Sequence, residues 1–186
     1  MTTPQTPPGA LVLLVGPAGA GKSTYAAHRY LPTEILSSDA FRALVADDPA
    51  DQEANADAFR LLHAVARARS RRGLTTVVDA TNLTDGARRP LLALAERFGR
   101  PVVAIIFDGP VERALAQNAA RSERVVPEAV VRLHHAQLAA AVAALRRGGI
   151  PMIAADLGKG IEGLHDGGLP GGGHRSDATD RPFDGG

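Results

Sequence analysis

An apolar run, Leu11–Val15, leads directly into a glycine-rich segment and then into a stretch with helical periodicity. The segment reads Gly16-Pro17-Ala18-Gly19-Ala20-Gly21-Lys22-Ser23-Thr24, which matches the pattern GxxxxGK(S/T) in the strand–turn–helix context that it requires. Its glycines let the backbone curl so that successive N–H groups point inward, and the helix adds partial positive charge at its N-terminus. The pattern therefore predicts a binding site for the phosphates of a nucleoside triphosphate such as ATP.

Two polar residues of this loop have expected roles. Lys22 should reach the β- and γ-phosphates, and the Ser23 hydroxyl should bind Mg²⁺. The chain has 21 basic residues, of which Lys22 and Lys159 alone are lysines. An incidental glycine-rich turn is the alternative, and the full match in its required context argues against it.

Composition excludes several classes of protein and site. The 186 residues are 45% hydrophobic and 22% charged, which suits a globular chain with one sizeable core and excludes collagen and wholly disordered chains. The absence of cysteine excludes disulfides, a thiolate nucleophile and cysteine-ligated metal. A net charge of +1 means that any attraction to nucleic acid must come from local basic patches.

Short apolar runs alternate with helical patterns from residue 10 onward, which predicts an α/β fold with a mostly parallel sheet. We expect strands near residues 10–15, 34–37, 74–78, 101–107 and 150–154, and helices near 22–30, 39–46, 55–72, 84–98, 110–120 and 127–147. Residues 1–9 are expected to be a flexible leader, 10–156 the folded domain, and 157–186 a glycine-rich tail or linker.

Two carboxylates are placed where parallel strands end. Asp39 follows the second predicted strand and lies three residues before Arg42, so the two share one face of a helix. A kinase needs a carboxylate that accepts a hydroxyl proton, and Asp39 is the candidate, although Ser38 or Asp39 could instead be an ordinary helix N-cap. Asp79 ends another apolar strand and is expected to hold Mg²⁺, directly or through water, unless Asp79 and Asn82 only bond their own turn.

A basic segment between the last two predicted helices suggests a lid. Arg121 and Arg124 are three residues apart and could clamp the γ-phosphate, although arginines are common at helix ends. The sequence contains neither the NKxD motif of GTPases nor an LSGGQ motif, and a chain of this size has room for one nucleotide and one acceptor. A kinase is therefore favoured.

These segments resemble the 5′-polynucleotide kinase domain of bacterial polynucleotide kinase–phosphatases. The resemblance spans about residues 11–155 and rests on five stretches: GPAGAGKST, EILSSDAFRALVADDPADQ, AFRLLH, TTVVDATNL with the following ARRPLL, and NAARSERVVPEAVVRLHHAQL. It implies a P-loop NTPase fold with an adenylate-kinase-like parallel sheet, the first strand central, helices on both faces and an arginine-bearing lid at residues 113–126.

The resemblance also implies an activity and its residues. Asp39 would be the general base toward a 5′-hydroxyl of DNA or RNA, Arg42 would orient Asp39 or contact the acceptor strand, and Arg121 would grip the donor phosphates. The family often has an arginine where this chain has Gln117, so either Arg113 or Arg124 substitutes or turnover is weakened. Phosphatase and ligase-like modules, which follow the kinase in the bacterial enzymes, are expected as partners on a longer or separate chain.

Two rival functions and a location complete the expectations. The same scaffold could phosphorylate a small-molecule hydroxyl of a sugar, nucleoside or antibiotic, or it could be a non-catalytic ATP-binding module of a repair complex. Apolar runs such as Val102–Phe107 are too short to span a bilayer, and no basic segment precedes Ala10 as in a secretory signal. We therefore expect a cytoplasmic protein with no membrane partner.

Overall fold

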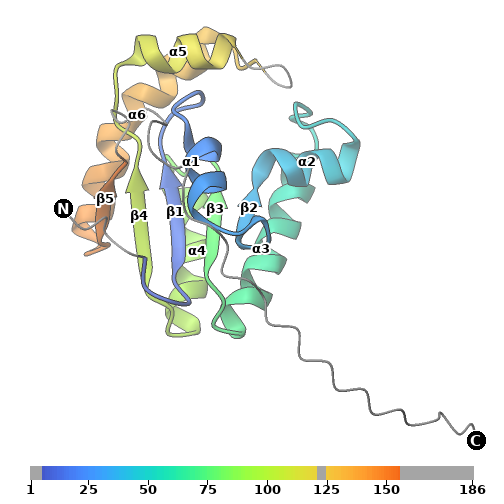
Figure 1. The fold of residues 1–186 in the computed structure, drawn as a ribbon, viewed down its shortest axis with the longest axis vertical. Helices are drawn as coiled ribbons and strands as arrows, with labels where there is room; N and C mark the ends of the chain where they lie inside the picture. Colours follow the sequence, from blue (N-terminus) through green and yellow to red (C-terminus); the bar gives the residue numbers. More distant parts are fainter. Residues whose placement is uncertain (1–5, 121–124, 156–186) are drawn as a thin grey trace, which may run out of the picture.

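The central strand of the sheet is the apolar run that precedes the glycine-rich loop. The computed structural model describes residues 6–120 and 125–155. Its elements, in chain order, are β1 (Leu11–Val15), α1 (Lys22–Arg29), a 3₁₀ turn (Pro32–Glu34), β2 (Ile35–Ser37), α2 (Ser38–Ala46), α3 (Asn55–Arg71), β3 (Thr76–Asp79), α4 (Asp85–Arg97), β4 (Val102–Ile106), α5 (Val111–Ala119), α6 (Glu128–Arg147) and β5 (Met152–Ala154). Figure 1 shows β1 with β3 and β4 on either side.

All strand pairs are parallel, and the order across the sheet is β2-β3-β1-β4-β5. Every residue of β1 and β3 is buried, as expected for strands covered on both faces. Parallel pairing brings the carboxyl ends of all strands to one edge, which we call the carboxyl edge. The predicted α/β class, the parallel sheet and the central first strand are confirmed.

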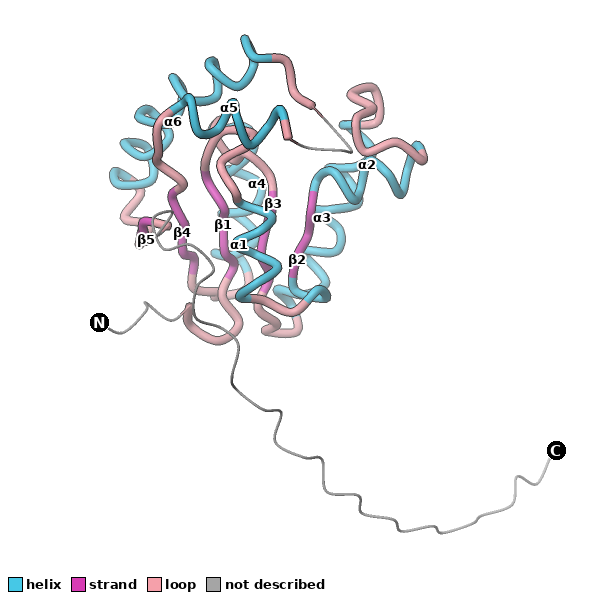
Figure 2. The backbone as a smooth tube through the Cα atoms, turned by 45° about the horizontal axis from the view of Figure 1, so that its top comes forward, coloured by secondary structure: helices cyan, strands magenta, loops and turns pink. Residues whose placement is uncertain are grey.

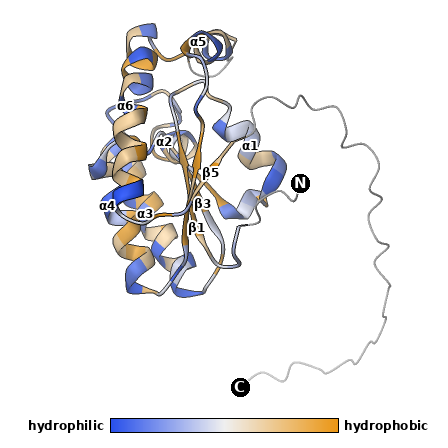
Figure 3. Ribbon diagram, turned by 90° about the vertical axis from the view of Figure 1, so that its left-hand side faces the viewer, coloured by the Kyte–Doolittle hydropathy of each residue, from blue (hydrophilic) through white to orange (hydrophobic). Residues whose placement is uncertain are grey.

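Of the three apolar clusters in the described residues, two cover the sheet, one on each face, and the third joins the loop after β1 to α5 and α6. Leu62 of α3, Leu91 of α4 and Leu138 of α6 pack with Leu11 and Leu13 on one face. Helix α1 covers the other face. Figure 3 shows the sheet edge-on, with α3, α4 and α6 on one side and α1 on the other.

Helices α2 and α5 lie at the carboxyl edge, on opposite sides of the turn that follows β1 (Figure 2). Helix α2 starts directly where β2 ends, and α5 follows β4 after a short connection. The fold therefore leaves the end of β1 between two helices that belong to different halves of the sheet.

The expected strands and helices are all present, and their bounds shift by one or two residues. The 3₁₀ turn at Pro32–Glu34 was not predicted. The part of the expected leader that is described is tied to the domain, because the Thr6 and Tyr30 hydroxyls are 2.8 Å apart and the Gly9 amide bonds the Thr75 hydroxyl. The expected tail at 157–186 lies outside the described residues. None of the helices in the described ranges is long and apolar enough to cross a membrane.

Truncation of a core leucine in α3 should destabilise the fold, because it removes packing between α3 and the sheet. Leu62 is fully buried, so Leu62→Ala should lower the free energy of unfolding by about 2–5 kcal/mol in urea. Leu44→Ala is the matched control, because the Leu44 side chain is 73% exposed and its loss should change stability by less than about 0.5 kcal/mol. Equal effects of the two substitutions would contradict the packing described here.

Candidate functional site

The turn from β1 into α1 has the geometry of a phosphate-binding loop. Gly19 and Gly21 adopt positive φ angles of 79° and 83°, and Gly21 is the N-cap of α1. Because Gly21 carries no side chain that could cap the helix, the first-turn amides of α1 remain open to an anion. The loop is held from behind by the Gly16 amide, which donates to the Thr81 carbonyl at 3.1 Å.

Lys22 lies across this loop. Its Nζ donates to the carbonyl oxygens of Gly16 at 3.0 Å and Pro17 at 2.7 Å, and the side chain is buried. The ammonium group is therefore fixed inside the curve that the loop amides line. This is the position from which a cation can offset the charge of bound phosphates.

The loop packs closely against two other segments. A Cβ on Gly16 would lie 2.7 Å from the Cβ of Phe107, and a Cβ on Gly19 would lie 2.1 Å from the Ala114 carbonyl oxygen in α5. Glycine is thus required at both positions by steric contact with the protein itself. A small pocket opens beside the loop and is lined by Pro17, Ala20, Phe107, Gly109, Pro110, Arg113, Ala114 and Gln117.

The carboxylate at the end of β3 stands beside the end of β2. Asp79 is buried and pairs in register with Ser37. Asn82, with φ of 50°, donates its amide to the carbonyls of Leu14 at 2.8 Å and Val78 at 3.2 Å. Asn82 therefore bonds its own turn, as in the alternative interpretation of this segment, and its bond to Leu14 also fixes the end of β1.

Asp39 is held by a buried arginine. Ser37, whose hydroxyl accepts a bond from the Ala40 amide, is the N-cap of α2, so the alternative that Ser38 or Asp39 is the cap is wrong. Asp39 instead forms an ion pair with Arg42, one helical turn later. The Asp39 side chain is 32% exposed, whereas that of Arg42 is 4% exposed.

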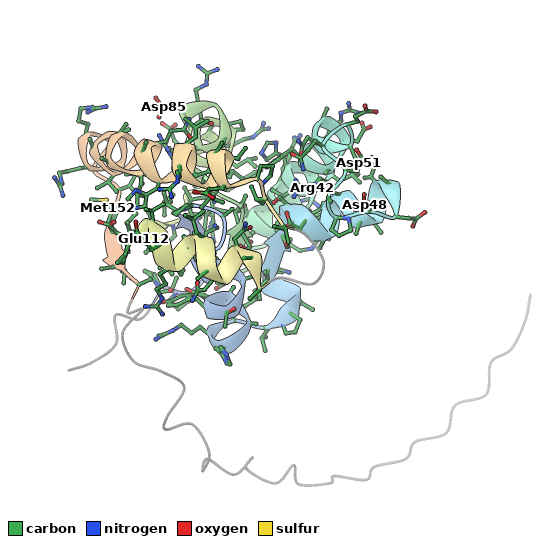
Figure 4. All side chains as sticks on the ribbon, turned by 90° about the horizontal axis from the view of Figure 1, so that it is seen from above. Arg42, Asp48, Asp51, Asp85, Glu112 and Met152 are labelled. Atoms are coloured by element: carbon green, nitrogen blue, oxygen red, sulfur yellow. The ribbon has the colours of Figure 1, made fainter. Side chains whose placement is uncertain are left out.

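The remaining donors of Arg42 bind the segment after α2. Its Nε donates to the Pro49 carbonyl at 2.8 Å, and its Nη1 donates to Asn55 Oδ1 at 2.8 Å. Seen from above, Arg42 lies between α2 and α3, and Asp48 and Asp51 lie farther out (Figure 4). This burial favours orientation of Asp39 over direct contact with an acceptor as the role of Arg42.

The base of the expected lid is closed by one asparagine. Asn118 Nδ2 donates to the Val126 carbonyl at 2.8 Å, and the Val126 amide donates to Asn118 Oδ1 at 3.0 Å. These two bonds join the end of α5 to the segment before α6. The two expected lid arginines, Arg121 and Arg124, lie outside the described residues.

The donor set at the loop fits a hard divalent cation. Ser23 lies in the first turn of α1 and Asp79 at the adjacent strand end, so a hydroxyl and a carboxylate oxygen flank the loop. Within the described ranges no three His, Cys, Asp or Glu residues are grouped as a dedicated metal site. Mg²⁺ fits such a sparse set, because it usually keeps several waters and binds through one or two protein oxygens plus substrate phosphates.

Two side chains outside the predicted site have pKa values that are shifted by burial. Burial raises the pKa of Tyr25, and the positive charge of Arg29 offsets part of this rise. Burial lowers the pKa of His63. The Tyr25 ring packs against Phe107 with centroids 5.3 Å apart, and His63 lies beside Phe59 on α3. Neither side chain belongs to the predicted site.

Sequence reasoning missed three side chains that support the site. Asn55 holds Arg42, Asn118 closes the base of the lid, and Arg88 donates to the Asn82 carbonyl at 2.8 Å. A polar residue within an amphipathic helix was the available signal for Asn118. No local pattern pairs Asn55 with Arg42, because the loop between them determines their contact.

Gly19→Ala should lower the free energy of unfolding by more than the positive φ angle alone explains. Gly99 also has a positive φ, of 59°, but nothing lies within 4 Å of its added Cβ. Gly99→Ala should therefore lower the free energy of unfolding by about 1–2 kcal/mol, the cost of the left-handed conformation. Gly19→Ala adds the clash with α5 to the same conformational cost. Its free energy of unfolding, measured in urea, should therefore fall clearly further than that of Gly99→Ala. Similar losses for both variants would contradict the close approach of α5 to the loop.

Comparisons with known proteins agree with this geometry. The profile of the family AAA_33, described as an AAA domain, matches residues 11–145. No curated protein sequence matches the chain. Among solved structures, one of the Pnkp1/Rnl/Hen1 RNA repair complex has a TM-score of 0.57 and 22% identity, covering 73% of this chain and 45% of that chain. This chain therefore spans less than half the length of that relative.

Two further structures have the same fold. A sugar kinase from Janibacter sp. HTCC2649 has a TM-score of 0.55 and 22% identity, covering 81% of this chain and 87% of that one. The AvrRxo1-ORF1:-ORF2 structure with ATP has a TM-score of 0.58 and 17% identity, covering 73% of this chain and 50% of that chain. At these identities the likeness establishes the fold alone. With the profile match over most of its length, the chain belongs to the AAA domain family AAA_33 and has a P-loop kinase-like fold.

Proposed function

We propose that this protein is an ATP- and Mg²⁺-dependent kinase that transfers the γ-phosphate to the 5′-hydroxyl end of DNA or RNA. The observation that carries the proposal is the placement of two groups at one edge of the sheet. The loop with Lys22 follows β1, and Asp39, fixed by buried Arg42, follows β2. A donor-phosphate cradle and an oriented proton acceptor are the two parts that phosphoryl transfer requires.

The reaction assigns a role to each part. As the 5′ oxygen bonds the γ-phosphorus, its proton passes to the Asp39 carboxylate, and the bond from that phosphorus to the β,γ-bridging oxygen breaks to release ADP. Transfer is direct, with no covalent enzyme intermediate. Lys22 and the loop amides offset charge on the donor. Mg²⁺, when bound, would neutralise phosphate charge, with Ser23 and Asp79 as its protein contacts.

The choice of a 5′-hydroxyl acceptor rests on the resemblance of the motifs around Asp39, Asp79 and Asn118. The structural likeness to a chain of an RNA repair complex supports the same class. Phosphatase or ligase modules on a longer or separate chain remain part of the proposal. Arg121 and Arg124 are the proposed lid residues that would grip the donor phosphates.

A small-molecule hydroxyl is the second candidate acceptor, and the loop between α2 and α3 favours it. This loop, whose Pro49 carbonyl accepts a bond from Arg42, carries four carboxylates: Asp47, Asp48, Asp51 and Glu53. A nucleic-acid strand near them would meet like-charge repulsion, whereas a neutral sugar would not. The likeness to a sugar kinase over most of both chains is consistent with this candidate.

An acceptor panel separates the candidates. With γ-labelled ATP and Mg²⁺, label should enter a 5′-hydroxyl oligonucleotide and should be absent from the matched 5′-phosphorylated strand. Transfer to sugars or nucleosides alone would favour the second candidate. ATP binding without transfer to any acceptor would favour a non-catalytic module and would implicate Gln117.

Substitution of Asp39 should separate binding from chemistry. Asp39→Asn keeps the size of the side chain but removes the proton acceptor, so transfer should fall about 10²–10⁴-fold while ATP binding persists. Lys22→Ala should lower transfer by about 10²-fold or more, because a donor-phosphate contact is lost. Asp48→Asn is the control, since its oxygen can still accept the Ala50 amide and transfer should be unchanged. If Asp39→Asn lowers ATP binding and transfer in parallel, Asp39 is structural and the proposed chemistry is wrong.

A further inference from the structure

The turn after β3 is held by the buried side chain of Asn82. Its Nδ2 donates to the carbonyl oxygens of Val78 at 3.2 Å and Ala80 at 3.3 Å. These residues stand on either side of Asp79, so one amide group holds the backbone at both ends of that residue. The same nitrogen donates to the Leu14 carbonyl at 2.8 Å, in β1, which lies beside β3 (Figure 1). Asn82 therefore links the backbone around Asp79 to the strand that leads into the phosphate loop.

The main chain of Asn82 is held in turn by Arg88 of α4. Arg88 Nη1 donates to the Asn82 carbonyl at 2.8 Å, and Nη2 forms an ion pair with Asp85, one helical turn earlier. The Arg88 side chain is 4% exposed, whereas that of Asp85 is 83% exposed. An ion pair with so exposed an acid contributes little to stability, so it does not account for the burial of the guanidinium group. The bond to Asn82 is the contact that connects Arg88 to the site.

Asn82 adopts a conformation that a simple turn would leave to glycine. Its φ of 50° lies in the left-handed region, which glycine enters without strain. Its Oδ1 is buried and has no hydrogen-bond partner within the described ranges, which lowers stability. Glycine at this position would avoid both costs. The bonds that the Asn82 amide makes to the carbonyls around Asp79 and at the end of β1 are what the asparagine adds.

The proposed metal contacts depend on this arrangement. Asp79 is buried at the end of β3, and Ser23 lies in the first turn of α1. Because the two come from different elements, their spacing is fixed by the bonds that join the end of β3 to the end of β1. Mg²⁺ demands near-octahedral geometry, so displacement of one protein oxygen would weaken its binding.

We propose that Asn82 is a positioning residue for Asp79 and that Arg88 holds Asn82 in this role. The inference rests on the proposed function and deepens it, because it assigns the geometry of the Mg²⁺-nucleotide site to the turn at residues 79–82. Both side chains act through Asp79 and touch neither nucleotide nor metal. Groups that orient a metal ligand in this way typically contribute about 10–100-fold to metal affinity or activity.

The test measures how Mg²⁺ changes nucleotide binding and does not require phosphate transfer. Anisotropy of a fluorescent ATP analogue gives its dissociation constant in EDTA and over a range of Mg²⁺ concentrations. Asn82→Gly keeps the left-handed φ and removes the amide, and Arg88→Gln removes the guanidinium group. Both variants should need about 10–100-fold more Mg²⁺ than the wild type to bind the analogue equally tightly.

Binding in EDTA should change little in both variants. The phosphate loop keeps its contacts with Phe107 and Ala114 and the bond from the Gly16 amide to the Thr81 carbonyl. The expected defect is therefore specific to Mg²⁺. If Arg88→Gln does not fold, Asn82→Gly carries the test alone, because glycine suits the backbone conformation there.

Two matched controls make the same kinds of change elsewhere. Asp47, with φ of 56°, is the other described non-glycine residue with a positive φ, and it is exposed at the end of α2. Arg89 is the exposed neighbour of Arg88 on α4. Asp47→Gly and Arg89→Gln should keep the Mg²⁺ dependence of the wild type.

A purely structural role gives a different result. If Asn82→Gly and Arg88→Gln lower the free energy of unfolding in urea but keep the wild-type Mg²⁺ dependence, the inference is overturned. Equal losses of binding in EDTA and in Mg²⁺, or an equal rise in the Mg²⁺ requirement of the controls, would also overturn it.

The same data separate this inference from the proposed function. If Mg²⁺ does not tighten binding of the analogue to the wild type, the inference fails together with the proposed Mg²⁺ site. If the wild type transfers phosphate to no acceptor while the two variants still need more Mg²⁺, the proposed kinase activity fails and the inference stands.

Discussion

The buried guanidinium of Arg42 is the interaction on which the acceptor side of the molecule depends. A buried charge is costly unless its donors are satisfied, and Arg42 satisfies them with the Asp39 carboxylate, the Pro49 carbonyl and the Asn55 amide oxygen. One side chain thereby joins the first turn of α2, the loop that follows it and the first turn of α3. The orientation of Asp39 consequently depends on α2, the loop after it and the start of α3 together.

The donor side depends on close backbone contacts around the buried Lys22. Gly16 lies against Phe107, Gly19 lies against the Ala114 carbonyl, and the Gly16 amide bonds the Thr81 carbonyl. The loop is therefore shaped by β4, α5 and the end of β3 before any ligand binds. This rigidity is what a preorganised phosphate site requires, since its amides need no rearrangement when charge arrives.

Most of the fold could be predicted because local pattern and tertiary structure agree. Local sequence patterns predict the apolar strands, the GxxxxGK(S/T) loop and the helix α3. Parallel pairing of the strands follows from their alternation with helices. The pairing of Asp39 with Arg42 could be predicted from their three-residue spacing. The roles of Asn55 and Asn118 could not, because Asn55 meets Arg42 only through the loop from Asp47, and Asn118 meets Val126 only when the segment after α5 returns. The alternative cap positions, Ser38 and Asp39, lie one and two residues after the observed cap, because Ser37 and Ser38 are equally good caps by residue type.

The central claim is that Asp39 and the loop with Lys22 act on one acceptor hydroxyl. The most direct test is a crystal structure with a non-hydrolysable ATP analogue and a short 5′-hydroxyl oligonucleotide. The account predicts the γ-phosphate in the loop and the 5′ oxygen within about 2.6–3.2 Å of the Asp39 carboxylate, in line with the β,γ-bridging oxygen. A strand end bound away from Asp39, or a γ-phosphate that points away from α2, would contradict it.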